Sequence, residues 1–460
     1  MSTRTARHVE SSDDAGRASS PRVRTRVELL LFLTLWLAYG LTINSGNLSE
    51  FNLQQIGVEA VAERGHFYLE GSRAPELQPR GDVFEFGGHK YAAKQPGQFM
   101  AGALVYFLLR PFGVSYTGNY LLASALVTFL TASLVTALAG VALFRLAREF
   151  DQDNLRRPLA VALVFGLCTT ALPYAGIAHH DALASGYLLL AFHLFVRVAR
   201  ETTRRARLRT FLAGLLVGLT LTTSMLPAFM AAVVGLYFLS LRRWRLLPFV
   251  VLGAAVGLAP LFVYDAVSFG NPFLLPNVAG NYSDTFFRLD PANFAAKLAF
   301  YSRMVASYVP VFAAGLVGLL LYTREHRREQ LTMLGLVVVL AAYVLNIDTE
   351  GDCQYGPRYL LPLMPYAALG LLGFARLQSP TLRRLALSAA ALAALASFAL
   401  NLPGALHGSM YCDVHAHALP PYLSALARGE TKTFPLALWL ALPFLVSVVL
   451  LVKKLLAVSR

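Results

Sequence analysis

The chain has 460 residues, of which 56% are hydrophobic and only 14% are charged, and its formal net charge is +14 at pH 7. Soluble domains carry about 25% charged residues, so this composition excludes an ordinary soluble globular protein. The positive charge does not indicate nucleic-acid binding, because the basic residues are mostly arginines in short clusters between long apolar runs. That pattern is typical of a polytopic all-α membrane protein with basic cytoplasmic loops.

The N-terminal segment 1–26 is rich in serine, arginine and aspartate, which predicts a disordered cytoplasmic tail. The apolar run after it has no small-residue cleavage site, so we expect this run to remain as the first membrane span rather than to be removed as a signal peptide. The remainder, 27–460, is predicted to form a single transmembrane domain.

The apolar runs predict about twelve transmembrane helices. They are 27–44, 117–144, 158–177, 182–197, 209–224, 226–241, 246–266, 299–321, 331–346, 359–375, 385–401 and 434–452. With the N-terminus in the cytoplasm, arginine-rich loops such as RETTRRARLR and REHRR all fall inside, and so does the C-terminus. The outer face then carries the loops 45–116, 267–298, 347–358 and 402–433. We therefore expect any chemistry to occur on the outer face.

The segment 97–110 in the first outer loop is apolar but too short to cross a bilayer. A span needs about 20 residues, and this run ends at Arg110-Pro111 and Gly113. If it did cross, every later arginine cluster would face outward, so we predict an interfacial or re-entrant helix. The same logic divides 209–241 into a hairpin of two helices, with the break at SMLP.

Two candidate site residues lie in the first outer loop. Glu50 follows the first span and precedes a segment with a mixed apolar pattern, which predicts an interfacial helix ending at Gly65. Glu50 could be a catalytic acid or only an exposed acid favoured by a helix dipole. Lys94 precedes Gln95-Pro96, where the short helix begins, so it could form a phosphate site with the backbone N–H groups. It could equally be a lysine that extends to the membrane interface.

A second cluster, His179, His180 and Asp181, lies in a short turn between two predicted spans. Two imidazoles beside a carboxylate suit a divalent metal cation, or a general base with its orienting partner. Asp181 could instead serve only as the N-cap of the next helix.

A third candidate, Arg358, begins a predicted span after the acidic residues Asp348, Glu350 and Asp352. An arginine at the hydrocarbon boundary could bind the phosphate of a lipid carrier, or it could pair with one of these acids. The sequence contains no P-loop, GxSxG, HExxH or CxxC motif, so no nucleotide cofactor is expected.

In two stretches, YAAKQPGQFMAGALVYFLLRPFG and YGPRYLLPLMPYAAL, the chain resembles membrane glycosyltransferases of the GT-C class. These polyprenyl-phosphate-sugar-dependent enzymes include the bacterial aminoarabinose transferase and protein mannosyltransferases. The first stretch looks like the Lys-x-Pro-Gly segment of the class, and the second like its GPRYLLPxLPF segment. Glu50, 15 residues before Gly65, matches the first-loop acid, although the chain has Ser49-Glu50 where the class has Asp or Asp-Glu. Asp181 matches the acid of the second outer loop.

The resemblance implies an integral membrane glycosyltransferase that moves a hexosyl or pentosyl group, with inversion, from a polyprenyl-phosphate donor to an acceptor. The acceptor could be a lipid, a glycan or a protein, and the active site would face outward from a bacterial inner membrane. Glu50 or Asp181 would be the general base. Lys94, Arg358 and Tyr91 would bind the phosphate. A polytopic transporter or flippase for a lipid-linked or small polar substrate is the alternative, although transporters tend to place ionisable residues near the membrane midplane.

Two cysteines, Cys353 and Cys412, both fall in predicted outer loops, where an oxidising compartment would allow a disulfide between them. The bridge would bring the segment MYCDVHAH near Arg358. Two free thiols are the alternative, because the sequence does not give the Cα separation that a disulfide requires.

Overall fold

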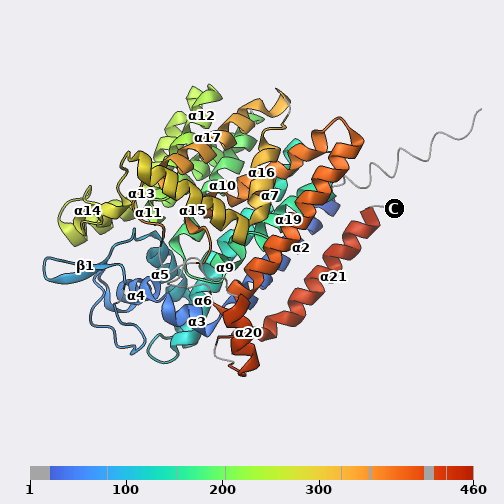
Figure 1. Cartoon of the computed structure of the whole chain (residues 1–460). Coiled ribbons are helices and arrows are strands. Elements are labelled where there is room, and N and C mark those ends of the chain that lie inside the picture. The colour runs from blue at the N-terminus through green and yellow to red at the C-terminus, as the bar shows by residue number, and fades with distance from the viewer. Residues whose placement is uncertain are drawn as a thin grey trace, which may run out of the picture.

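The computed structural model describes residues 21–79, 81–152, 154–201, 204–322, 324–351, 355–408, 419–430 and 433–458. The regular structure in these residues is almost entirely helical, and most of the helices run side by side in one bundle (Figure 1). A hairpin of two short strands, β1 (Val83–Phe86) and β2 (His89–Ala92), lies at one end of that bundle. The predicted all-α membrane architecture is confirmed.

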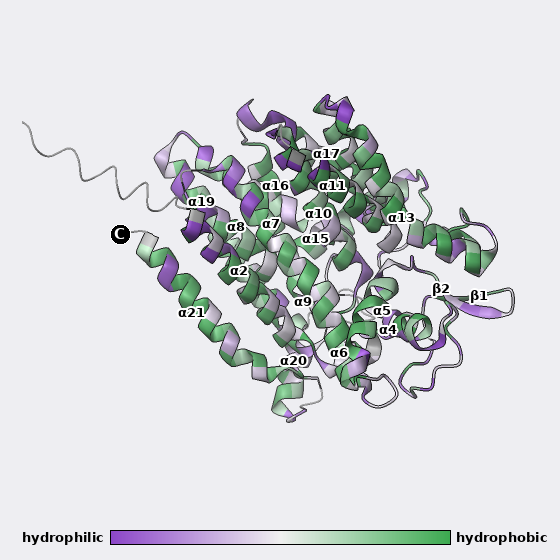
Figure 2. Ribbon diagram, turned by 180° about the vertical axis from the view of Figure 1, so that it is seen from behind, coloured by the Kyte–Doolittle hydropathy of each residue, from purple (hydrophilic) through white to green (hydrophobic). Residues whose placement is uncertain are grey.

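Seven helical stretches of the described residues are long and apolar enough to cross a bilayer. They are α2 (Pro21–Thr42), α6 (Tyr120–Thr128) with α7 (Leu134–Phe150), α10 (His180–Ala199), α13 (Leu247–Phe269), α18 (Met364–Gly370) with its flanking turns, α19 (Pro380–His407) and α21 (Ala441–Val458). Hydrophobic residues predominate along these helices, and hydrophilic residues gather near the ends of the bundle (Figure 2). Helix α2 begins before the predicted first span, and residues 1–20 of the predicted tail lie outside the described residues.

An eighth candidate span consists of two helices, α15 (Pro291–Tyr308) and α16 (Pro310–Leu319), which are bent by 109° relative to each other. The sequence predicts a single span over 299–321. Proline fixes its own φ and disfavours helical geometry in the residue before it, and Val309 has φ −146° and ψ 57°. The number of spans therefore depends on how this pair lies in the membrane, and the total of about twelve stays a prediction.

The remaining predicted spans correspond to helices that are shorter or more polar. They are α8 (Arg156–Leu167) with α9 (Ala171–Ala175), α11 (Arg204–Thr223), α12 (Ala228–Ser240) and α17 (Arg327–Val344). The predicted break at SMLP is confirmed, because α11 ends directly before this sequence and α12 begins directly after it.

Short helices and single turns complete the described structure. The short helices are α3 (Ser45–Glu50), α4 (Leu53–Glu59), α5 (Gly97–Leu109), α14 (Pro276–Ala279) and α20 (Leu419–Ala427). The 3-10 and π turns are η1 (Ala60–Arg64), η2 (Arg110–Phe112), η3 (Phe129–Ser133), η4 (Trp244–Leu246), η5 (Ser283–Thr285), η6 (Arg324–His326), η7 (Arg358–Leu363), η8 (Leu371–Arg376) and η9 (Leu438–Leu440).

The segment 45–116, which is the predicted first outer loop, packs around an apolar core of its own. Helix α4 continues through η1 and ends at Gly65, as predicted, and the φ of 72° at this glycine gives a left-handed helix end. Helix α5 is the predicted short helix; at 1.5 Å per residue it is about 20 Å long, less than the roughly 30 Å hydrocarbon core. The core of the loop includes Ile56, Phe99 and Tyr116 together with Tyr264 of α13. This contact with α13 anchors the loop to the helix bundle.

The β1–β2 hairpin was not predicted from the sequence. Its two-residue turn is formed by Gly87 and Gly88, whose φ angles of 57° and 83° suit glycine in a turn of this kind. The strands are antiparallel, and Val83 pairs with Ala92. The residues on either side of the hairpin, Asp82 and Lys94, therefore lie at the same end of it.

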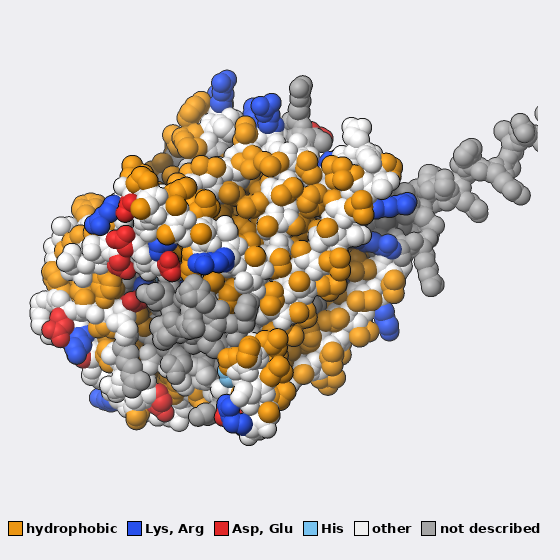
Figure 3. Space-filling view, viewed as in Figure 1, with side chains coloured by type: hydrophobic (Ala, Val, Ile, Leu, Met, Phe, Trp, Pro, Cys, Tyr) orange, Lys and Arg blue, Asp and Glu red, His pale blue; other side chains and the backbone are white. Residues whose placement is uncertain are grey.

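The surface has the character of a membrane protein. On the face shown in Figure 3, hydrophobic side chains cover most of the middle, and charged side chains gather toward the two ends of the bundle. Exposed apolar side chains on α13, α19 and α21 include Val267, Leu392 and Leu442. Lipid tails would cover such a surface in a bilayer, so the chain is an integral membrane protein.

Candidate active site

A polar cavity of about 110 Å³ lies where the segment 45–116 meets the start of α10. Its lining includes Lys94, His180, Asp181 and Arg358, together with Ser224 from the break between α11 and α12. The structure therefore brings together, in one cavity, residues from each of three clusters that the sequence indicated separately.

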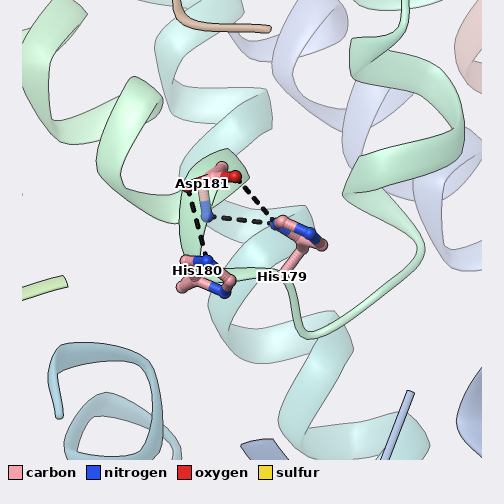
Figure 4. A group of neighbouring side chains, drawn as sticks. All are labelled: His179, His180 and Asp181. Atoms are coloured by element: carbon pink, nitrogen blue, oxygen red, sulfur yellow. Dashed lines mark hydrogen bonds and ion pairs between the residues drawn. The ribbon is translucent and has the colours of Figure 1, made fainter. Parts of the chain in front are cut away.

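The His-His-Asp turn is organised by a helix cap. His179 is the N-cap of α10, and its Nδ1 accepts a hydrogen bond from the backbone N–H of Asp181 at 3.1 Å. The alternative in which Asp181 caps the helix is therefore wrong. All three side chains of the turn are buried, and the two imidazoles lie close to the Asp181 carboxylate (Figure 4).

The carboxylate of Asp181 is held from several directions. The hydroxyl of Ser224 donates a hydrogen bond to Oδ1 at 2.6 Å, and His180 Nε2 lies 3.5 Å from the same oxygen. Nε of Arg358 lies 3.9 Å from Oδ2. These contacts fix the carboxylate beside the cavity, where it could accept a proton from a hydroxyl that binds there.

Arg358 is the first residue of η7 and is only 8% exposed. Its guanidinium carbon lies 4.7 Å from the centre of the Tyr359 ring. Among the described residues, Nε of Arg358 has no hydrogen-bond partner. A buried donor of this kind requires an acceptor, and phosphate oxygens are well suited to arginine.

The acids that precede Arg358 pair elsewhere. Asp348 lies 3.7 Å from Arg288, and Glu350 lies 3.4 Å from Lys297. The alternative in which Arg358 pairs with one of them is therefore wrong for these two acids, and Asp352 lies outside the described residues.

Lys94 forms an ion pair with Asp82, with Nζ 2.6 Å from Oδ2. Burial raises the pKa of the Asp82 carboxyl, but the positive charges of Lys94 and Arg358 lower it by a larger amount. The pKa of Asp82 therefore lies below its ordinary value. The side chain of Lys94 is 19% exposed and lines the cavity. Asp82 therefore holds the lysine beside the cavity without burying it.

Two other predicted site residues are not placed in the cavity. Tyr91 is buried and packs against Phe84 and Phe269, so the described structure does not bring it to the cavity lining. The side chain of Glu50 lies outside the described residues. The next residue, Phe51, stacks on His179 with ring centres 4.9 Å apart, so the end of α3 lies beside the His-His-Asp turn. The predicted disulfide of Cys353 and Cys412 also lies outside the described residues.

Several polar residues around the cavity were not predicted from the sequence, among them Asp82, Ser224 and Gln54. Nε2 of Gln54 lies 3.3 Å from Nδ1 of His180. A signal for Asp82 was present, because the two glycines of VFEFGGHKYA between alternating residues are typical of a hairpin. The predicted topology placed Ser224 on the same membrane face as the His-His-Asp turn. A topology does not specify which side chains touch, so the contact with Asp181 was not predicted.

The donor set of the His-His-Asp turn fits a divalent cation. Two imidazoles and a carboxylate are common zinc ligands, and one ligand atom from each residue lies within 4.8 Å of the others. Nδ1 of His179 caps α10, but its Nε2 has no hydrogen-bond partner among the described residues. The charge of Arg358 near Asp181 would compete with such a cation.

An apolar groove of about 520 Å³ lies beside this cavity, between α15, α16, α17 and η7. Leu345 and Leu360 line the groove, while Ile347 and Tyr359 line the polar cavity. Residues at the end of α17 and the start of η7 therefore line both the polar cavity and the apolar groove, which lie side by side.

A scan against protein-family models finds no match. A search of curated proteins also finds no match. Among solved structures, the crystal structure of ArnT from Cupriavidus metallidurans bound to undecaprenyl phosphate is similar over 95% of this chain and 78% of the ArnT chain, with a TM-score of 0.53 at 15% sequence identity. The two chains share a fold. ArnT in the apo state aligns over 93% of this chain and 76% of its own, with a TM-score of 0.47 at 16% identity. The expected resemblance to the aminoarabinose transferase group is thus confirmed for the fold.

Proposed function

We propose that the chain is a membrane glycosyltransferase that moves a sugar from a polyprenyl-phosphate donor to an acceptor hydroxyl. The observation that carries this proposal is the meeting of one fixed carboxylate, Asp181, with two cations, Lys94 and Arg358, in a single cavity. The shared fold with ArnT, whose crystal structure contains undecaprenyl phosphate, supports a lipid of the same class.

The two compartments beside η7 match the two parts of such a donor. The phosphate would lie between Lys94 and Arg358, where Nε of Arg358, which has no hydrogen-bond partner among the described residues, could donate to a phosphate oxygen. The polyprenyl chain would lie in the adjoining apolar groove, where its burial is favoured by the hydrophobic effect.

The carboxylate of Asp181 would act as the general base. It would accept the proton of the acceptor hydroxyl while that oxygen forms a bond to the anomeric carbon of the sugar. The bond between this carbon and the phosphate oxygen would break, and its electron pair would leave with the polyprenyl phosphate. Lys94 and Arg358 would stabilise the negative charge that develops on the leaving phosphate. Attack opposite the leaving group would invert the anomeric carbon.

A divalent cation at His179, His180 and Asp181 would supply additional positive charge for a phosphate or would lower the pKa of a bound hydroxyl. Glu50 would then be the remaining candidate for the base, since Asp181 would be occupied as a ligand. Elemental analysis of the purified protein and of a His179→Ala variant distinguishes Asp181 as general base from Asp181 as metal ligand. A metal that is present in the unmodified chain and absent from the variant supports the bound cation.

The reaction is tested with purified protein and a panel of radiolabelled polyprenyl-phosphate sugars. Consumption of one donor with release of polyprenyl phosphate, lost in Asp181→Asn, supports the proposal. If no donor is consumed and labelled substrate instead crosses a proteoliposome membrane, the chain is a transporter or flippase.

We also propose that both termini are cytoplasmic and that the active site faces outward. Cysteine labelling in a cysteine-free background tests this. A Thr117→Cys variant, at the exposed turn directly before α6, should react with an impermeant maleimide on intact cells. A Gln378→Cys variant, before α19, should react only after permeabilisation. The reverse result would invert the topology.

A further inference from the structure

A second polar cavity, of about 950 Å³, lies at the other end of the helix bundle, between α2, α7, α10 and α11. His193 and Arg197 of α10 line it. At 1.5 Å per residue, they lie about 20 Å or more along the helix from His180, which lines the candidate active site. The two cavities are therefore separate.

Positive charge dominates the lining of this second cavity. Five arginines and two glutamates contribute to it, an excess of three positive charges: Arg24, Arg145, Arg148, Arg197, Arg209, Glu28 and Glu149. Both acids are already paired, because Glu28 accepts a hydrogen bond from Arg145 at 2.7 Å and Glu149 accepts one from Arg197 at 3.0 Å. Glu201, which lies outside the lining, also pairs with Arg209 and Arg197, so only part of the positive charge of the lining stays unmatched.

Two side chains of the lining have buried polar atoms without a partner. Within the described residues, Arg148 forms no ion pair, and its buried Nε has no hydrogen-bond acceptor. His193 is only 6% exposed, and its Nδ1 has no hydrogen-bond partner in the same part of the chain. Buried polar atoms are rarely left unsatisfied unless water or an ion binds them. Because the cavity has excess positive charge, the expected ligand is an anion.

We propose that this cavity binds a phosphate-bearing anion through Arg148 and His193. A guanidinium group can donate two parallel hydrogen bonds to a phosphate, and a neutral imidazole that carries its proton on Nδ1 can donate a further one. Leu138, Leu194 and Leu216 line the same cavity, so it could also receive the glycerol and upper acyl portion of a phospholipid. A free phosphate compound would use the charged part of the lining alone.

The test uses the purified full-length chain and two probes: phosphatidylglycerol, with phosphatidylcholine as the neutral comparison, and inorganic pyrophosphate. Native mass spectrometry measures the bound lipid, and calorimetry measures the binding of pyrophosphate. Arg148→Gln should weaken anion binding about tenfold or more, because it removes a charge-assisted hydrogen bond. Arg148→Lys should retain part of the affinity, because it keeps the charge.

The matched control is Arg384→Gln, which removes an exposed arginine at the start of α19, outside this cavity. The control should bind the anion as the unmodified chain does, and thermal melting of each variant without ligand reports whether it is folded. Selective binding of phosphatidylglycerol identifies a lipid ligand, whereas comparable binding of pyrophosphate identifies a soluble one; either supports the site. Equal losses in Arg148→Gln and Arg384→Gln, or no binding of either anion by the unmodified chain, would overturn it.

Discussion

The two polar cavities along α10 both contain arginine, but they differ in size and in the balance of charge. The cavity at the start of α10 measures about 110 Å³, and its lining contains the single carboxylate of Asp181 together with Lys94 and Arg358. The cavity at the other end measures about 950 Å³, and its arginines outnumber its glutamates.

This difference indicates two kinds of task. In the small cavity, Ser224 and His180 fix the carboxylate close to a cation, which is the arrangement that proton transfer beside a leaving phosphate requires. In the large cavity, both glutamates of the lining accept hydrogen bonds from arginines, and the arginines outnumber them, which suits binding of an anion. Changes at the first cavity should therefore alter turnover, and changes at the second should alter anion binding only.

The largest effect is expected from Asp181→Asn, which removes the general base. Turnover should fall by about 10²–10⁴-fold, measured as release of polyprenyl phosphate from a labelled donor. Asp348→Asn removes an acid that pairs with Arg288 away from the cavity and should leave turnover nearly unchanged. Arg148→Gln, in the second cavity, should also preserve turnover. Normal turnover in Asp181→Asn, or a large loss in Arg148→Gln, would contradict the division of tasks.

A smaller loss is expected from Lys94→Ala, because it removes one of two cations that face the donor phosphate. We expect kcat/KM to fall by about 10–100-fold, since a charge-assisted hydrogen bond contributes about 1.5–3 kcal/mol. Lys90→Ala, which removes an exposed lysine of β2 outside the cavity lining, is the matched control. Similar small effects in both variants would show that Lys94 only anchors the loop at the interface.

A loss of about tenfold in kcat is expected from Ser224→Ala, which removes the hydroxyl that positions the Asp181 carboxylate. KM should change little, because Ser224 is proposed to act through Asp181 rather than by holding the donor. Ser185→Ala is a demanding control, since Ser185 bonds only the backbone oxygen of Asp181. If Ser224→Ala raised KM and left kcat intact, its role would be in binding.

The smallest effect concerns the pH dependence of the Asp82–Lys94 pair. The pKa of Asp82 is lowered in the folded chain, so the pair contributes stability above the ordinary carboxyl range, near pH 4, and loses it as the pH falls through the lowered pKa. The contribution is small because Asp82 is about half exposed. The melting temperature of Asp82→Asn should lie slightly below that of the unmodified chain at pH 7, and the difference should shrink as the pH is lowered below about 4. A difference that grows at low pH would contradict this account.

Much of the architecture follows from local sequence. Apolar runs and arginine clusters indicate a polytopic membrane protein. Glycine and proline mark the ends of helices, as at Gly65 after η1 and at Pro227 before α12. The bend between α15 and α16 was not predicted, because a continuous apolar run does not specify the angle between two helices within it. Pro310 did mark the position of the bend.

The site was only partly accessible from sequence. Lys94, Asp181 and Arg358 stood out because charged residues are costly near a membrane and because they lie in motif-like stretches. Their grouping, and the contact of Ser224 with Asp181, depend on how α10, α11 and η7 pack, which no local pattern specifies. Tyr91 illustrates the opposite error: an aromatic residue close to Lys94 in sequence faces the aromatic core of the loop instead of the cavity.

The hairpin of β1 and β2 limits where the chain can change its length. Side chains alternate between the two faces of a strand, so one residue added within β1 or β2 would move the side chains after it to the opposite face. This shift would separate Asp82 from Lys94. Residues added at the exposed turn of Gly87 and Gly88 would leave the paired strands in register, and the entropic cost of a longer loop grows slowly with its length. An affinity tag or a fluorescent label could therefore be inserted between these two glycines while Lys94 stays beside the cavity.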